Sequence, residues 1–178
     1  SSTGPAALGA LLLLVLLVAG IWLWRTSTTP PGGAPPAETP QPVLDFKVVD
    51  ANEQEVQLSD YRGKIVFINF WATWCGPCKQ ELPMLEAYYR EHQDESFVLL
   101  GVNVSDRPED ALAFYEAEGY TFSLAFDPPG NVLIELGARG LPVSLLVDKE
   151  GHLVEQWIGA LPPHVLEESV TPRLPGTS

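Results

Sequence analysis

The chain has 178 residues, of which 23 are acidic and 10 are basic, and its formal net charge is −13 at pH 7. Such acidity opposes binding to nucleic acid or to an anionic membrane surface, and solubility explains it more simply than a basic partner does. The two cysteines cannot build a disulfide framework, and they do not fill a four-ligand zinc site. We therefore expect no nucleic-acid partner, no bound metal and no cofactor.

The chain begins with an uncharged apolar run at residues 6–24, rich in Leu and Val, which ends in Trp22, Trp24 and Arg25. A helix of about 20 apolar residues crosses the hydrocarbon core of a bilayer, and Trp is typical of the membrane interface. We predict a transmembrane anchor at residues 1–25. A cleaved signal peptide fits less well, because its apolar core is usually about 7–15 residues. A buried core helix fits least, because nothing polar marks an outer face.

Residues 26–42 are rich in proline, threonine and glycine. Prolines favour an extended, semi-rigid chain that cannot bury a core. We interpret this segment as a linker that holds the following domain, residues 43–178, away from a surface.

Apolar strands alternate with helices in the rest of the chain. We predict strands at residues 44–49, 55–58, 65–70, 96–104, 123–126, 143–147 and 153–158. Helices are predicted at residues 76–92, 132–136 and 164–170, and a further helix capped by Ser105 or Asp106 is predicted to end at Glu118, before Gly119. The alternation indicates an α/β fold with a mixed central sheet and helices on both faces.

The two cysteines, Cys75 and Cys78, flank Gly76 and Pro77 where a predicted strand passes into a helix. A helix N-terminus carries unpaired N–H groups and partial positive charge, which favour a thiolate, the form that attacks a disulfide. We predict that Cys75 is the more exposed thiol and the nucleophile. Cys78, one turn inside the helix, should be shielded and resolve the mixed disulfide. Gly76 allows a tight turn, and Pro77 pre-sets a helical φ.

Residues 69–83, Asn-Phe-Trp-Ala-Thr-Trp-Cys-Gly-Pro-Cys-Lys-Gln-Glu-Leu-Pro, resemble the active-site segment of membrane-anchored thioredoxin-like thiol-disulfide oxidoreductases, the TlpA/ResA group. Residues 140–143, Gly-Leu-Pro-Val, together with residues 145–148 and Gly151, resemble the second signature of that family. The resemblance covers roughly residues 43–171 and the anchor. It implies a thioredoxin-like fold preceded by one N-terminal transmembrane helix.

The same resemblance implies that the Leu141–Pro142 peptide bond is cis and lies against the cysteines. A partner chain would then pair with this backbone as an extra strand. Pro142 is therefore assigned to the catalytic set, and five residues are expected to contact the partner: Trp74, Gly76, Pro77, Leu141 and Val143. Val143 stands where the family often has threonine, which puts partner specificity in question.

Glu81 stands three residues after Cys78, on the same face of the predicted helix. In the ResA-like branch a glutamate at this position lies near the cysteines and tunes their protonation. A nearby carboxylate raises the pKa of a thiol and can relay protons. The alternative is a solvated helix carboxylate. Asn69 replaces the buried Asp of many thioredoxins and cannot titrate, so Glu81 is the candidate acid.

The resemblance implies an extracytoplasmic, membrane-tethered enzyme, and it outweighs Arg25, which taken alone weakly favours a cytoplasmic domain. Gly-Pro is also the dipeptide of thioredoxin, which is reducing at about −270 mV. We therefore predict a reductase of partner disulfides. The resemblance implies apocytochrome c, during cytochrome c maturation, or copper-site proteins as partners, with a membrane-embedded reductant.

Two other functions share features with this sequence. A peroxiredoxin shares much of this architecture, but its P-x-x-x-[ST]-x-x-C pattern fails, because Ile68 and Ala72 occupy the two upstream positions. A copper-binding chaperone module would use the two thiolates, which bind Cu(I) well. That function would need a histidine beside the cysteines, and none is near them in sequence.

Overall fold

The computed structural model describes residues 41–42, 45–93 and 96–175. The predicted anchor at residues 1–25 and almost all of the predicted linker lie outside these residues. Within the described part of the chain, no helix combines the length and apolar character needed to cross a membrane.

The domain is built on one mixed sheet, whose eight described strands run in the order β1-β8-β7-β4-β5-β6-β2-β3. Their bounds are β1 Gln41–Pro42, β2 Lys47–Asp50, β3 Glu55–Gln57, β4 Ile65–Trp71, β5 Phe97–Val104, β6 Ser123–Asp127, β7 Val143–Val147 and β8 His152–Ile158. Strands β4, β5 and β6 are parallel, whereas β7 pairs antiparallel with β4 and with β8. The mixed sheet expected from the sequence is confirmed.

Every residue of β4 and β5 is buried, as their apolar sequences predict for strands covered on both faces. The two strands pair in register over their whole common length, from Ile65 opposite Phe97 to Trp71 opposite Asn103. Because the strands are parallel, the chain leaves both of them at the same edge of the sheet. The segment that contains the cysteines follows β4 at that edge.

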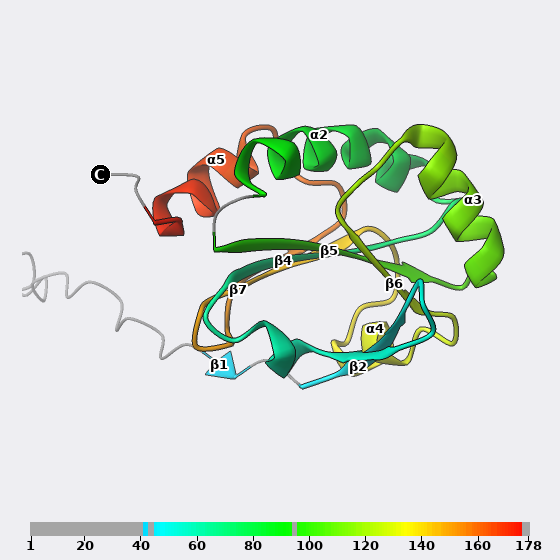
Figure 1. Ribbon diagram of the computed structural model, residues 1–178, viewed down its shortest axis with the longest axis horizontal. Helices are drawn as coiled ribbons and strands as arrows, with labels where there is room; N and C mark the ends of the chain where they lie inside the picture. Colours follow the sequence, from blue (N-terminus) through cyan, green and yellow to red (C-terminus); the bar gives the residue numbers. More distant parts are fainter. Residues whose placement is uncertain (1–40, 43–44, 94–95, 176–178) are drawn as a thin grey trace, which may run out of the picture. The chain divides into compact units, whose positions relative to one another are not determined.

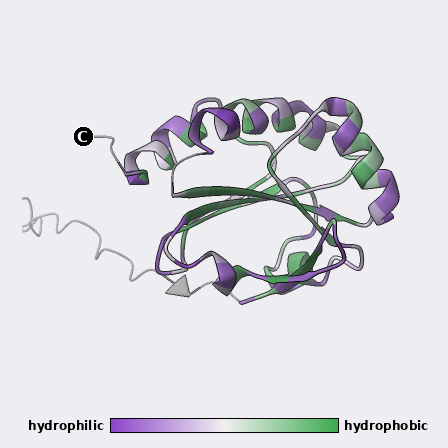
Figure 2. Cartoon of the chain, in the orientation of Figure 1, coloured by the Kyte–Doolittle hydropathy of each residue, from purple (hydrophilic) through white to green (hydrophobic). Residues whose placement is uncertain are grey.

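Helices cover both faces of the sheet (Figure 1), with bounds α2 Gly76–His92, α3 Pro108–Glu118, α4 Asn131–Glu135 and α5 Val165–Ser169. One core cluster joins α2, α3 and α5 to the sheet through Leu82, Ala111 and Leu166. The other packs α4 and the 3₁₀ turn η1 (Leu58–Tyr61) against the opposite face. Figure 2 shows hydrophobic central strands and helices of mixed hydropathy, as expected for one buried face on each helix.

The predicted start of helix α3 is wrong. Its N-cap is Arg107, whose side chain makes no capping bond, and neither Ser105 nor Asp106 caps the helix. The Asp106 carboxylate is instead occupied by donors from Thr73 and Asn103. The predicted end is confirmed, because Gly119 follows the helix with φ 72° in the left-handed region that favours glycine.

Gly101 in β5 lies where the core has no room for a side chain. A Cβ atom at this position would lie 2.5 Å from Cε2 of Phe122 and 3.3 Å from Nε1 of Trp71. We expect Gly101→Ala to lower the free energy of unfolding by about 1–3 kcal/mol, as overpacking of a core does. Urea unfolding of the two proteins measures the difference.

The matched control is Gly140→Ala, because a Cβ atom there meets nothing within 4 Å and the backbone φ is not positive. This variant should change the free energy of unfolding by no more than about 0.5 kcal/mol. Equal effects of the two variants would contradict the overpacking account.

Candidate active site

Cys75 and Cys78 form a disulfide at the junction of strand β4 and helix α2, with their Cα atoms 5.3 Å apart. Cys75 is the N-cap of α2, and its Sγ accepts the backbone N–H of Cys78 at 3.2 Å. Cys75 is the more exposed of the two, at 4% against 0%, although both are buried in this oxidised form. The strand-to-helix placement predicted from the sequence is confirmed.

The residues around the disulfide differ sharply in exposure. Trp74 is 64% exposed, and Gly76 and Pro77 are also exposed. The conformational reason predicted for Gly76 is wrong, because its φ is not positive and a Cβ atom there would meet nothing within 4 Å. What glycine leaves at this position is open space beside Cys75.

The Leu141–Pro142 peptide bond is cis, as the resemblance implied. Val143 begins β7 and lies opposite Phe70 of β4, so Pro142 sits beside the end of β4 from which the cysteine segment departs. The Pro142 carbonyl accepts the N–H of Gly159 at 2.9 Å. The structure therefore brings Pro142 to the edge of the sheet that carries the disulfide.

Val143 is less suited to partner contact than the sequence suggested. Its side chain is 0% exposed, and β7 is paired on both edges, with Phe70 on one side and Ile158 on the other. An added strand has no free edge at this residue. Leu141, by contrast, lies outside the strand and is half-buried.

Glu81 is 6% exposed, so the alternative of a solvated helix carboxylate is wrong. Its Oε1 accepts a hydrogen bond from Nδ2 of Asn69 at 2.7 Å, and its Oε2 accepts the N–H of Leu161 at 3.1 Å. Burial raises the pKa of Glu81 above its ordinary value, and the bonds from Leu161 and Asn69 only partly oppose that rise. The folded protein therefore holds the proton of Glu81 more tightly than an exposed glutamate would.

Ser144 and Leu161 also belong to this buried group, and the sequence did not predict either of them. Nδ2 of Asn69 donates to Oγ of Ser144 at 2.9 Å, and the backbone N–H of Leu161 donates to Glu81 from a loop 80 residues along the chain. Asn69 cannot titrate, but it donates a hydrogen bond to the carboxyl of Glu81, which can. Only the pairing of β4 with β7 brings Asn69 opposite Ser144.

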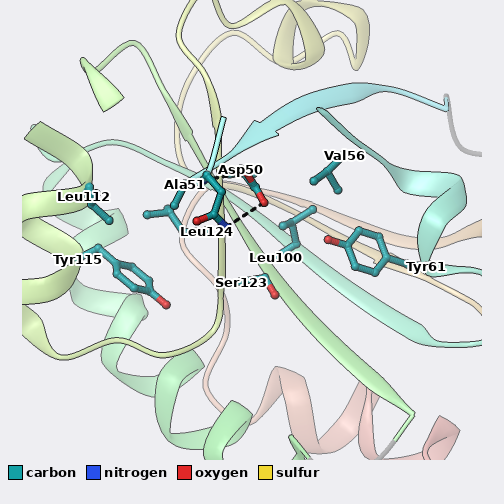
Figure 3. Close-up of a pocket in the computed structure, with 11 residues that line it drawn as sticks. Asp50, Ala51, Val56, Tyr61, Leu100, Leu112, Tyr115, Ser123 and Leu124 are labelled. Carbon is teal, nitrogen blue, oxygen red and sulfur yellow. Dashed lines mark hydrogen bonds between the residues drawn. The ribbon is translucent and has the colours of Figure 1, made fainter. Parts of the chain in front are cut away.

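Glu81 also borders a cleft of about 250 Å³ that opens beside the start of α2, and the lining residues are Pro77, Gln80, Glu81, Met84, Ala160, Leu161 and Pro163. A second cavity of about 300 Å³ lies between β2, β5, β6 and α3, with Leu100, Leu112 and Tyr115 in its wall (Figure 3). None of the predicted site residues lines this second cavity. The candidate chemistry is therefore confined to the disulfide end of the sheet.

The described side chains include no group of three or more His, Cys, Asp or Glu that could hold a metal ion. No histidine joins Cys75 and Cys78 in such a group, so the donor set that the copper-chaperone alternative needs is not assembled there.

A strand that passes through a Cys-Gly-Pro-Cys disulfide into a helix, with a cis-proline at the same edge of the sheet, defines a thioredoxin-like thiol-disulfide oxidoreductase. The sequence profile of the AhpC/TSA family matches residues 39–156, which is more than half of the chain. The chain belongs to the AhpC/TSA family and, through its relatives, to the ResA thiol-disulfide oxidoreductases.

Three similar proteins support this assignment. The thiol-disulfide oxidoreductase ResA of Geobacillus kaustophilus is 32% identical over 92% of this chain and 94% of its own. ResA of Geobacillus thermodenitrificans is 40% identical over 60% of this chain and 62% of its own. The crystal structure of a Chlorobium tepidum protein assigned as thiol:disulfide interchange protein DsbE covers 76% of this chain and 97% of its own, with a TM-score of 0.70 and 30% identity.

The raised pKa of Glu81 predicts a specific dependence of stability on pH. The folded protein holds this proton more tightly than the unfolded chain, so the stabilisation is complete below the ordinary value of 4.5 and is lost as pH rises through the folded pKa. We expect the difference in unfolding free energy between wild type and Glu81→Gln to fall as pH rises. Urea unfolding of the oxidised proteins between about pH 4 and about pH 8 measures it.

Glu86→Gln is the matched control, because Glu86 is buried in the same helix and has the opposite shift. Burial alone would raise its pKa, but bonds from Thr121 and Arg90 outweigh burial and lower it. Its stabilisation is complete above 4.5 and is lost as pH falls through the folded pKa. As pH rises, the Glu86→Gln difference should therefore rise slightly at about pH 4 and then stay level while the Glu81→Gln difference falls, and a parallel fall of both would contradict the raised pKa of Glu81.

Proposed function

We propose that this domain reduces disulfides of partner proteins outside the cytoplasm, and that Cys75 is the nucleophile. The observation that carries the proposal is the position of the disulfide, with Cys75 at the N-cap of α2 and Cys78 buried one turn inside. The N–H of Cys78 already donates to Sγ of Cys75 at 3.2 Å. In the reduced domain this bond and the helix N-terminus favour a thiolate at Cys75.

The reaction proceeds in two exchanges. The Cys75 thiolate attacks one sulfur of the partner disulfide, which forms a mixed disulfide and releases the other partner sulfur as a thiolate. The thiolate of Cys78 then attacks Sγ of Cys75, re-forms the Cys75–Cys78 disulfide and releases the second partner thiolate. Two electrons pass from the domain to the partner. A membrane-embedded dithiol reductant returns them to the domain.

We propose that the carboxylate of Glu81 accepts the proton that the resolving thiol of Cys78 loses. Cys78 must lose its proton before it attacks, and Glu81 lies one helical turn away on the same face of α2. The carboxyl is buried and held by Asn69 and by the N–H of Leu161, so its environment is fixed. It also borders the open cleft beside Pro77, which connects it with solvent and with a docked partner.

The proposed docking surface surrounds the disulfide on the exposed side. Trp74 offers a large apolar face, since its side chain is 64% exposed, and Gly76 and Pro77 leave the approach open. Leu141, before the cis-proline, lies at the same edge of the sheet. Aromatic side chains of this kind carry much of the binding energy in protein interfaces.

The partner class and the location follow from the family resemblance and the N-terminal sequence. Apocytochrome c, which must present reduced cysteines for haem attachment, and copper-site proteins are the proposed substrates. The apolar run at residues 6–24 is proposed to anchor the chain in the membrane, and residues 26–42 to space the domain, residues 43–178, from it.

Replacing the resolving cysteine should trap the partner. In Cys78→Ser the mixed disulfide on Cys75 has no internal thiol to release it, so a covalent complex should accumulate. The complex is measured by non-reducing electrophoresis and mass spectrometry after incubation with disulfide-bonded apocytochrome c. Cys75→Ser is the matched control and should trap far less. Equal trapping by both variants would reverse or abolish the assigned roles.

The anchor is tested by cell fractionation. The full chain should sediment with membranes and should be degraded by protease added to intact cells or spheroplasts. A variant lacking residues 1–25 should leave the membrane fraction. Protection of the full chain from external protease would place the domain on the cytoplasmic side and contradict the proposed location.

A further inference from the structure

The nucleophile lies at the end of a short connection between β4 and α2. Strand β4 ends at Trp71 and helix α2 begins at Gly76, so four residues set the position of both Cys75 and the exposed ring of Trp74. Within this connection, the N–H of Cys75 donates to the carbonyl of Ala72 at 3.1 Å. Thr73, in the middle of the connection, is held by hydrogen bonds to Asp106, which lies outside the connection.

Both carboxylate oxygens of Asp106 accept hydrogen bonds from Thr73. Oδ2 accepts the backbone N–H of Thr73 at 2.7 Å, and Oδ1 accepts its hydroxyl at 2.9 Å. Hydrogen bonds to an ionised carboxylate are among the stronger ones in proteins. Two of them on one residue fix both the backbone and the side chain of Thr73.

Asp106 is itself fixed by strand β5. Oδ2 also accepts Nδ2 of Asn103 at 2.8 Å, and Asn103 is 1% exposed, opposite Trp71 in the sheet. Between Asn103 and Asp106 in the sequence, Ser105 adopts φ 68°, a left-handed conformation that is uncommon for a residue other than glycine. Such conformations persist where the surroundings enforce them, often at functional sites. The ends of β4 and β5 are thereby joined through one carboxylate.

We propose that Asp106 is a positioning residue, which acts through Thr73 to direct the ring of Trp74, next to Cys75, toward a protein substrate. The Trp74 ring is mostly exposed, so its direction depends on the backbone beneath it. A partner with an apolar segment next to its disulfide needs that direction, whereas a small disulfide reaches Cys75 without it. The inference rests on the proposed docking role of Trp74.

The experiment measures, in a single turnover, the second-order rate constant (equivalent to kcat/KM) for oxidation of the reduced full chain by disulfide-bonded apocytochrome c and by the small disulfide 5,5′-dithiobis(2-nitrobenzoate). In Asp106→Ala, kcat/KM for the protein should fall about tenfold, because a misplaced contact of this kind is costly, and kcat/KM for the small disulfide should change less than about twofold. Thr73→Ser keeps both donors and should retain the wild-type ratio, whereas Thr73→Val removes the hydroxyl and should lower it. An equal fall for both oxidants would overturn the proposal.

Asp127→Ala is the matched structural control. Asp127 is a buried carboxylate at the end of the neighbouring strand β6 and accepts the N–H groups of Asn131 at 3.3 Å and Val132 at 2.9 Å. Its loss removes a similar pair of bonds away from Thr73. The thermal midpoint should fall in both aspartate variants, but the ratio of the two kcat/KM values should fall only in Asp106→Ala. A similar fall of the ratio in both would show a merely structural effect.

A double-mutant cycle with Trp74→Ala tests whether Asp106 acts through the Trp74 ring. If Asp106 acts through the Trp74 ring, adding Asp106→Ala to Trp74→Ala should lower the ratio no further. If the two substitutions instead lower the ratio independently, so that their fold-changes multiply, Asp106 does not act through the Trp74 ring. A fall in Trp74→Ala without a fall in Asp106→Ala would overturn the positioning role and leave the proposed function standing.

Amide hydrogen exchange tests the positioning without any substrate. The Thr73 amide should exchange at least tenfold faster in Asp106→Ala than in wild type and Asp127→Ala, because its bond to Asp106 is lost. Unchanged exchange would overturn the inference, whether or not the chain reduces apocytochrome c. Failure of wild type to reduce apocytochrome c, with normal reaction of the small disulfide, would instead contradict the proposed substrate.

Discussion

The pairing of β4 with β5 is the constraint on which the site depends. Both strands are buried on both faces and pair in register from Ile65 opposite Phe97 to Trp71 opposite Asn103. A shift by one residue would move side chains such as Phe67 and Trp71 from one core cluster into the other, so the packing of both clusters depends on this register. Because the strands are parallel, their ends lie together, and the Cys75 connection meets the Asp106 loop there. The antiparallel β7 brings cis-Pro142 to the same place.

Helix α2 carries two buried glutamates whose surroundings give them opposite properties. Glu81 meets only an amide and one backbone N–H, so burial dominates and raises its pKa. Glu86 meets Arg90 and two donors of Thr121, and these partners lower its pKa in spite of burial. Burial favours the protonated form of the first carboxyl, whereas the partners of the second favour its anion, which holds the helix against the start of β6.

The cysteines and the proposed docking residue Trp74 lie on different structural elements. The two cysteines belong to the rigid start of α2, and Glu81 follows one turn later on the same helix. The exposed Trp74 belongs to the short connection before it, held through Thr73 by a carboxylate from the next strand. The residues that hold Trp74 are therefore not the cysteines that exchange electrons.

The sequence by itself determined the chemistry and the local structure. A thiol pair at a strand-to-helix junction, buried strands of apolar residues and a helix that ends at a glycine are local patterns, and period and turn chemistry are sufficient to read them. Tertiary structure alone decided the environment of the acid and of the loop. Glu81 is bonded by Asn69 and Leu161, and Thr73 by Asp106, across separations of 12, 80 and 33 residues. Asp106 resembled a helix cap in sequence, but the sheet register placed it against Thr73, because contacts between distant residues depend on the packing of the whole sheet.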